Sequence, residues 1–196
     1  MLNEKNLSLA GWFSVVSAVI TLPLIIIGFI SGMSENKSAA LLYLEALFST
    51  GYVVIYVYIF TILKRLLNEK VAFHDVDKYI TFLIWINVAI TVFSVITLPF
   101  IKVQEIVGVG MLILMIPLGV IYVVFGIKLL NCEDNLFGYL KPFSYMTIAT
   151  GIMMATIVFI LFGMITSIIS DVILALIFFK AAKLVQTQGS FASKQD

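Results

Sequence analysis

The sequence predicts an all-α, polytopic membrane protein of six transmembrane helices, built as three tandem helical hairpins with both termini in the cytoplasm. The first observation is composition: the 196 residues are 62% hydrophobic and 12% charged, whereas soluble domains average about 25% charged. The second is a series of long uncharged segments, and the third is a five-residue segment that occurs twice. A soluble domain of this length could not bury so much apolar surface, so we expect lipid to be the solvent of these helices.

The repeated segment is Val19-Ile20-Thr21-Leu22-Pro23, and the same five residues occur again as Val95-Ile96-Thr97-Leu98-Pro99. After each copy, a second apolar run ends in a basic cluster, at Lys64-Arg65 and at Lys128. A third pair of runs ends in the same way at Lys180 to Lys183. Such repetition indicates one helical hairpin used three times within a single membrane domain, 1–196. The expected hairpin units are about 9–68, 79–131 and 142–185, followed by a polar tail, 186–196.

The first four helices follow from the uncharged runs. Leu9–Ser34 is longer than the roughly 7–15 residues of a signal-peptide core, so it is predicted to be a spanning helix. The next three expected helices are Leu41–Leu63, Tyr79–Ile101 and Ile106–Ile127. A tight turn is expected at Lys102–Glu105.

The last apolar stretch has two interpretations. Pro142–Lys183 contains 42 residues, enough for two spans of about 20 residues each with a turn near Gly163–Ser167. Alternatively, it forms one long helix followed by an amphipathic helix on the membrane surface.

The distribution of basic residues favours two spans. With six helices and cytoplasmic termini, ten Lys and Arg residues lie on the cytoplasmic side and only Lys37 and Lys102 lie outside. With five helices the division becomes seven against five, because Lys180, Lys183 and Lys194 change sides. Basic residues are retained on the cytoplasmic side of membranes, so six helices are predicted.

Two segments carry a family resemblance: Ile96-Thr97-Leu98-Pro99-Phe100, with the similar Ile20–Leu24, and the run Gly108–Lys128 with Gly110, Gly119 and Gly126. In these segments the chain resembles the HdeD-like family of small bacterial inner-membrane proteins. The resemblance implies three tandem hairpins over most of the chain and a location in the inner membrane. The family is associated with acid resistance, so the resemblance also implies a stress-related role, and the family offers no established chemistry to carry over to this chain.

Three acids are candidates for an ion or ligand path: Glu45, Glu105 and Asp171. Each is expected at the outer end of the second helix of its unit. They could form an acidic ring at an outer vestibule that attracts cations or protons. The alternative, which we favour, places them at the water interface, where the dipole of a helix N-terminus stabilises negative charge.

Small polar residues form two stripes at helical spacing. Asn87, Thr91 and Ser94 share one face of the third expected helix, and Ser14, Ser17 and Thr21 share a face of the first. Contact between helices is the favoured role of both stripes, and a pore lining is the alternative. Asn87 is the further candidate for a ligand path, because a buried amide needs several hydrogen-bond partners.

Prolines and glycines suggest where helices end and where they touch. Pro23 and Pro99 are expected to end or to bend their helices, ending being preferred. Gly108, Gly110, Gly119 and Gly126 are expected to permit close helix contact. Aromatic residues are expected to form an interfacial belt at the cytoplasmic side, namely Trp12, Tyr79, Tyr139, Phe143 and Tyr145.

The sequence shows no motif for catalysis or for a cofactor. It contains one cysteine, Cys132, and one histidine, His74, and it lacks the Gly-x-Ser-x-Gly, His-Glu-x-x-His and P-loop patterns. His74-Asp75-x-Asp77 could form a weak divalent site, but a solvated loop is favoured. The near-zero net charge gives no case for nucleic acid binding.

The expected function is therefore a non-enzymatic, structural or interaction component of the inner membrane, without cofactor or metal. The alternative is a small channel, transporter or substrate-binding transporter subunit with an acidic outer vestibule. The expected partners are the lipid bilayer and either a second copy of the chain or another membrane protein.

Overall fold

The chain folds into six α-helices and one short 3-10 helix. The computed structural model describes residues 2–33, 39–156 and 159–192, and within these ranges the side chains of 31–33, 39, 101–109, 111 and 188–192 are not described. No strand occurs in these ranges, which confirms the all-α prediction. The elements are α1 (Glu4–Met33), α2 (Ala39–Val71), α3 (Asp77–Thr97), α4 (Ile101–Leu130), η1 (Leu136–Gly138), α5 (Leu140–Ala155) and α6 (Ile160–Ala192).

Five of these helices are long and apolar enough to cross a membrane: α1, α2, α3, α4 and α6. The exception is α5, which has only 16 residues and would reach about 24 Å of the roughly 30 Å hydrocarbon layer. Large apolar side chains cover the outside of the bundle. Leu47, Val54 and Trp85, for example, are each at least 67% exposed. Such a surface is costly in water and suits contact with lipid.

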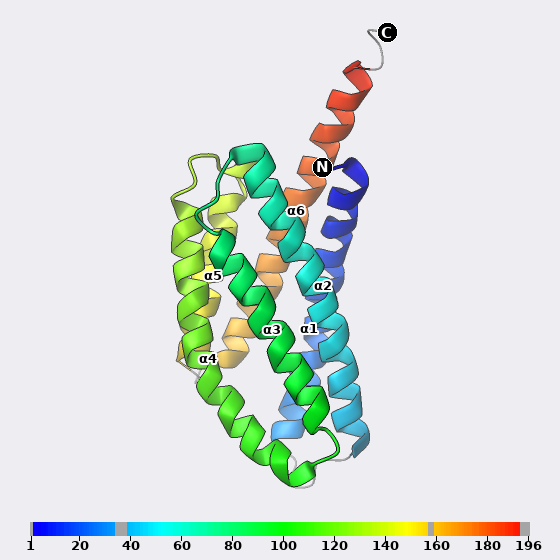
Figure 1. Ribbon diagram of the computed structural model, residues 1–196, viewed down its shortest axis with the longest axis vertical. Helices are drawn as coiled ribbons and strands as arrows, with labels where there is room; N and C mark the ends of the chain where they lie inside the picture. Colours follow the sequence, from blue (N-terminus) through cyan, green and yellow to red (C-terminus); the bar gives the residue numbers. More distant parts are fainter. Residues whose placement is uncertain (1, 34–38, 157–158, 193–196) are drawn as a thin grey trace.

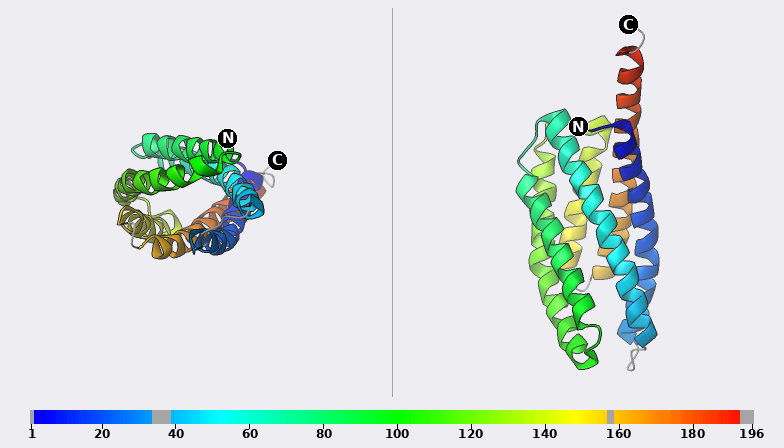
Figure 2. Two further views of the ribbon diagram at one scale, coloured as in Figure 1. Left: turned by 90° about the horizontal axis from the view of Figure 1, so that it is seen from below. Right: turned by 45° about the vertical axis from the view of Figure 1, so that its right-hand side comes forward.

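The six helices form a closed ring (Figures 1 and 2). Each helix runs antiparallel to the next and packs on it, and α6 returns to pack on α1. Among the described residues, no two α-helix backbones approach each other closely across the ring, where contact is made by side chains. The end at which α1 begins and α6 ends is called the terminal end here. The opposite end, which carries the α3–α4 turn, is called the distal end (Figure 1).

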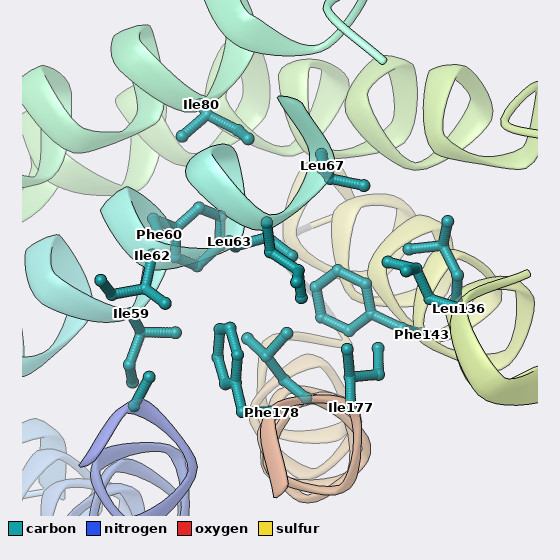
Figure 3. Packing of buried hydrophobic residues seen from close by; sticks show 14 of the residues in the cluster. Ile59, Phe60, Ile62, Leu63, Leu67, Ile80, Leu136, Phe143, Ile177 and Phe178 are labelled. Atoms are coloured by element: carbon teal, nitrogen blue, oxygen red, sulfur yellow. The ribbon is translucent and has the colours of Figure 1, made fainter. Parts of the chain in front are cut away.

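Apolar side chains fill the ring at its terminal half. Figure 3 shows them converging from α2, α3, α5 and α6, and Phe125 of α4 belongs to the same cluster. Leu63, Ile80, Ile177 and Phe178 are completely buried there. This cluster is called the apolar core. A hollow of about 270 Å³ lies beyond this core at the terminal end, lined among others by Lys70 and Asp134, and the other described hollows lie on the distal side of the core.

Glycines permit the closest helix contacts, as predicted for Gly119 and Gly126. A Cβ atom on Gly119 of α4 would stand 2.5 Å from the carbonyl oxygen of Gly151 in α5, and one on Gly126 would stand 2.9 Å from that of Ser144. The α1–α6 contact uses Gly11, whose added Cβ would stand 2.6 Å from the ring of Phe179. The prediction is wrong for Gly110, since nothing lies within 4 Å of that position. The surroundings of Gly108 lie outside the described side chains.

Several predicted boundaries are wrong, because charged residues mark where a helix leaves lipid but not where it ends. Helix α2 continues past Leu63 to Val71, and α6 continues through most of the expected tail to Ala192. The α3–α4 turn lies at 98–100, whereas Lys102–Glu105 belongs to α4. Pro99 explains this position, since it has no backbone N–H with which to continue the hydrogen bonds of α3.

The last apolar stretch forms two antiparallel helices, α5 and α6, in place of one helix and a surface segment (Figure 1). The expected turn at Gly163–Ser167 is wrong, because these residues lie within α6. Helix α5 ends earlier, at Ala155, and the backbone N–H of the next residue, Thr156, donates to the carbonyl oxygen of Ile152 at 3.1 Å. The prediction of a belt position for Phe143 is also wrong, since this side chain is 3% exposed and belongs to the apolar core.

Pro23 does not end a helix, so the preferred expectation for this residue is wrong. It lies inside α1, just as Pro117 lies inside α4. Membrane helices tolerate internal proline, because neighbouring helices and Ser or Thr side chains can satisfy the freed backbone groups. Pro99, in contrast, follows the end of α3 at Thr97, in agreement with a helix-ending role.

Candidate functional site

Asp171 is the carboxylate that the fold places inside the bundle. It is the twelfth residue of α6, more than three turns from the start of that helix. The hydroxyl of Ser17 in α1 donates a hydrogen bond to Asp171 Oδ2 at 2.7 Å. Ionisable groups at such depth in an apolar helix are expensive and commonly functional. Asp171 is therefore the starting point of the site.

Three tyrosines lie beside Asp171. Tyr52 and Tyr56 come from successive turns of α2, with ring centroids 6.2 Å apart, and Tyr122 comes from α4. The hydroxyl groups of Tyr56 and Tyr122 are hydrogen bonded at 2.9 Å. Together with Asp171 these tyrosines line a small cavity of about 30 Å³. A volume of this size can hold a water molecule.

Ser170 adds a polar atom that lacks a partner. Its side chain is 8% exposed and lines the same small cavity. Its Oγ atom is buried and makes no hydrogen bond within the described part of the chain. An unsatisfied buried hydroxyl typically costs about 1–3 kcal/mol. A polar group of a ligand or a water molecule in the cavity would remove this cost.

A larger cavity of about 250 Å³ continues from the small one. The two share Tyr52, Tyr122, Thr150 and Ser167 in their walls. The far side of the larger cavity is mainly apolar and includes Leu24, Ile90, Met115, Leu118, Met154 and Met164. Both cavities together are called the central cavity. It has a polar pole at Asp171 and an apolar pole toward the distal end.

No basic side chain faces this carboxylate in the described structure. The walls of the central cavity contain no described Lys, Arg or His. The ion pair found among the described residues joins His74 Nδ1 to Asp77 Oδ2 at 3.5 Å, outside the bundle. The charge of an ionised Asp171 would thus be balanced by hydrogen-bond donors or by something that enters the cavity.

Of the other predicted acids, the described one lies at another level of the bundle. Glu45 is the seventh residue of α2, two turns or about 10 Å from Tyr52 toward the distal end. Glu105 lies early in α4, and its side chain is outside the described part. The predicted outer position is wrong for Asp171, because hydropathy locates a run of residues but not the depth of one acid within the bundle.

The polar stripes have mixed roles. Ser14, Ser17 and Thr21 are all buried, but only Ser17 reaches another helix, while Ser14 and Thr21 donate to carbonyls of α1 itself. Asn87 lines the larger cavity, as a ligand-path candidate should, and its amide nitrogen donates to the Leu83 carbonyl oxygen at 2.8 Å.

Sequence reasoning missed Tyr52, Tyr56, Tyr122 and Ser170. A signal was present in the tyrosines, which stand in the middle of apolar runs and not at the membrane interface where this residue is enriched. Serine carries no such signal, since it occurs throughout membrane helices.

The internal prolines of α1 and α4 lie close to the site. Pro23 precedes Leu24 and Pro117 precedes Leu118, and both leucines line the cavity wall.

The remaining polar candidates lie near the terminal end, away from the central cavity. His74 and Asp77 pair with each other, and Asp77 Oδ2 also accepts a hydrogen bond from Asn68 Nδ2 at 3.0 Å. Among the described residues, no three His, Cys, Asp or Glu side chains gather as a metal site would require. Cys132 is buried at the terminal end, and burial raises the pKa of its thiol, with the nearby Asp134 and Glu133 charges adding to the shift.

Comparison with protein-family models, with curated proteins and with solved structures finds no match to the chain.

Proposed function

We propose that this chain is a multi-pass membrane protein that binds a small molecule in the central cavity and takes part in its transport. The observation that carries this proposal is a cavity of about 250 Å³ that leads to an acid inside the bundle. Ligand sites are typically concave, mostly apolar and equipped with a few convergent polar groups. The central cavity has this composition.

In the proposed topology all six helices span the bilayer, as three hairpins, with both termini in the cytoplasm of a plasma or inner membrane. The excess of basic residues at the terminal end supports this orientation. The 16-residue helix α5 would cross by drawing the polar α4–α5 segment toward the bilayer, or by thinning the bilayer locally. The central cavity would then lie nearer the outer face.

The apolar core favours a binding site over an open channel. It fills the terminal half of the ring, where Leu63 and Phe178 are completely buried (Figure 3). An ion could not cross this region without a rearrangement of the helices. Release to the cytoplasm would thus require a second conformation, as expected of a transporter.

A structural or stress-related membrane component is the second candidate, and it involves no catalysis either. The tight α4–α5 contact at Gly119 and Gly151 favours it, because it holds two helices at backbone distance, as in a rigid scaffold. In this case the cavity would be a packing feature that solutes do not enter. Association with the HdeD-like family would fit this candidate.

Cysteine labelling separates the two candidates. In a Cys132→Ser background, Ser167→Cys places a thiol in the wall shared by both parts of the central cavity. Val172→Cys on the same helix is the matched control, because this position is 47% exposed on the bundle surface. Both variants would be treated, in sealed vesicles, with a small water-soluble thiosulfonate that reacts with ionised thiols.

A cavity open to solutes should let Ser167→Cys react at least about tenfold faster than Val172→Cys, since a thiol in lipid does not ionise. Equal and slow labelling from both membrane faces would exclude solute access. That result would overturn the proposed binding function and leave the structural component.

A further inference from the structure

We propose that the ligand of the central cavity is a small organic monocation, with Asp171 as its counter-ion. The inference rests on the proposed function and specifies the substrate class of the same site. Four independent features support it: an acid without a basic partner, an unsatisfied hydroxyl, a group of aromatic rings, and an apolar pole of limited size.

The charge of the site selects a cation. Asp171 lines the small part of the central cavity, whose walls contain no described basic side chain. Its Oδ2 atom accepts a hydrogen bond from Ser17. An ionised carboxylate without a partner is costly in a medium of low dielectric constant. A bound cation would remove this cost, whereas an anion would add repulsion. With one carboxylate in the described walls, a single positive charge is balanced.

The polar pole can bind an ammonium group. Ammonium groups donate hydrogen bonds and need acceptors, and Asp171 and the unsatisfied Ser170 Oγ can both accept. Tyr52, Tyr56 and Tyr122 surround the same space. Tyrosine ring faces attract cations, most strongly where water is excluded. These three rings can therefore bind a cation that has lost most of its hydration shell.

The apolar pole fits the organic part of a ligand and does not fit a metal ion. Leu24, Ile90, Met115 and Leu118 face the larger part of the cavity, and these side chains cannot replace the hydration shell of an inorganic cation. A cavity of about 150 Å³ holds benzene. The 250 Å³ available here therefore suits a body of about ten non-hydrogen atoms, by proportion. Methionine, which adapts to irregular shapes, would tolerate variation in that body.

The test compares three probes of nearly equal shape that differ in charge: benzylamine, protonated at neutral pH, benzyl alcohol, and benzoate. Binding to the purified full-length chain in lipid nanodiscs would be measured by equilibrium dialysis, with empty nanodiscs to subtract partitioning into lipid. The variants are Asp171→Asn and, as a matched removal of an acid elsewhere in the bundle, Glu45→Gln.

Saturable binding of benzylamine, stronger than that of benzyl alcohol by at least about tenfold, is expected, because desolvated charge pairs commonly contribute at least this much. Asp171→Asn should abolish the preference for benzylamine, and Glu45→Gln should leave it. The comparison of the three probes on the unaltered chain needs no variant, so it stands even if Asp171→Asn misfolds.

Two other results would overturn the inference. Equal or stronger binding of benzyl alcohol would show a neutral ligand class and would leave the proposed function intact. Absence of binding by all three probes, with rapid labelling of Ser167→Cys, would reject the monocation class for an accessible cavity. Slow labelling of Ser167→Cys would instead reject the proposed function itself, so the two failures are distinguishable.

Discussion

At the scale of single residues, side-chain size and charge decide what the interior of the bundle can do. Asp171 brings the carboxylate and Ser17 holds one of its oxygens at 2.7 Å. The tyrosines of α2 and α4 add hydroxyl groups and ring faces, so the polar side chains lie together at one level of an otherwise apolar bundle. At other positions the absence of a side chain matters most, as at the glycines of the α4–α5 contact.

Gly119→Ala is expected to destabilise the fold, because its Cβ atom would stand 2.5 Å from the carbonyl oxygen of Gly151 and 2.7 Å from the backbone nitrogen of Ala155. Neither backbone atom can move without shifting α5. Overpacking of this kind costs about 1–3 kcal/mol. Thermal unfolding in detergent micelles, followed by circular dichroism, would measure the loss as a lower Tm.

Gly110→Ala is the control on the same helix, since nothing lies within 4 Å of the added Cβ. It should leave Tm unchanged or raise it, because alanine has the higher helix propensity. Equal Tm values for the two variants would contradict the role of Gly119 in helix contact.

At the scale of elements, the α1–α6 contact closes the ring. Two features support it: the flat surface at Gly11, which receives Phe179, and the Ser17–Asp171 hydrogen bond. Trp12 also meets the ring of Phe179 edge-on, with centroids 5.5 Å apart. Because these residues come from opposite ends of the chain, the contact joins the first and last helices without help from any loop.

Ser17→Ala should weaken ring closure, since it removes a hydrogen bond between helices and leaves Asp171 Oδ2 without this donor. The expected loss is about 1 kcal/mol of unfolding free energy, the usual scale for such bonds in membranes. Unfolding by sodium dodecyl sulfate in mixed micelles would measure it.

Ser14→Ala provides the matched control, because Ser14 is equally buried but donates only to the Ala10 carbonyl of its own helix. Ser14→Ala should lower the unfolding free energy clearly less than Ser17→Ala does. In an Asp171→Ala background the two serine variants should cost about the same. A cost of Ser17→Ala that persists in that background would argue against the Ser17–Asp171 bond as the cause.

At the scale of the whole molecule, the apolar core separates a hollow at the terminal end from the central cavity. The apolar core occupies the terminal half, and the central cavity lies toward the distal end. The view along the ring axis in Figure 2 shows the helices encircling this axis. An asymmetric interior of this kind gives the two faces of the membrane different access, provided that the bundle has one orientation.

The proposed orientation predicts which loops react from outside a cell. In a Cys132→Ser background, Phe100→Cys reports on the distal end and His74→Cys on the terminal end, where both native side chains are well exposed. A maleimide that cannot cross membranes should label Phe100→Cys in intact cells and His74→Cys only after lysis. The reverse pattern would place the termini outside, and labelling of both in intact cells would contradict a fixed single orientation.

Sequence alone determined the class of the fold. Long uncharged runs can be satisfied only by helices in lipid, because backbone groups must pair within the segment. Hydropathy is a sum over neighbours in the chain, and for this reason it located α1 to α4 and indicated two helices in the last stretch. The sequence also singled out Asp171 and Asn87, since a polar group in an apolar run is visible without a structure, and it included Ser17 in a polar stripe expected to contact another helix.

Tertiary structure decided how deep those groups lie and what they meet. Asp171 was expected at an outer helix end, yet α6 begins at Ile160 and carries it into the bundle. Pro23 could have ended a helix, but α1 continues through it, and Pro99 ends α3. The tyrosines of α2 and α4 meet Asp171 of α6 only because the ring closes. These outcomes depend on contacts between distant segments, and no sum over adjacent residues contains them.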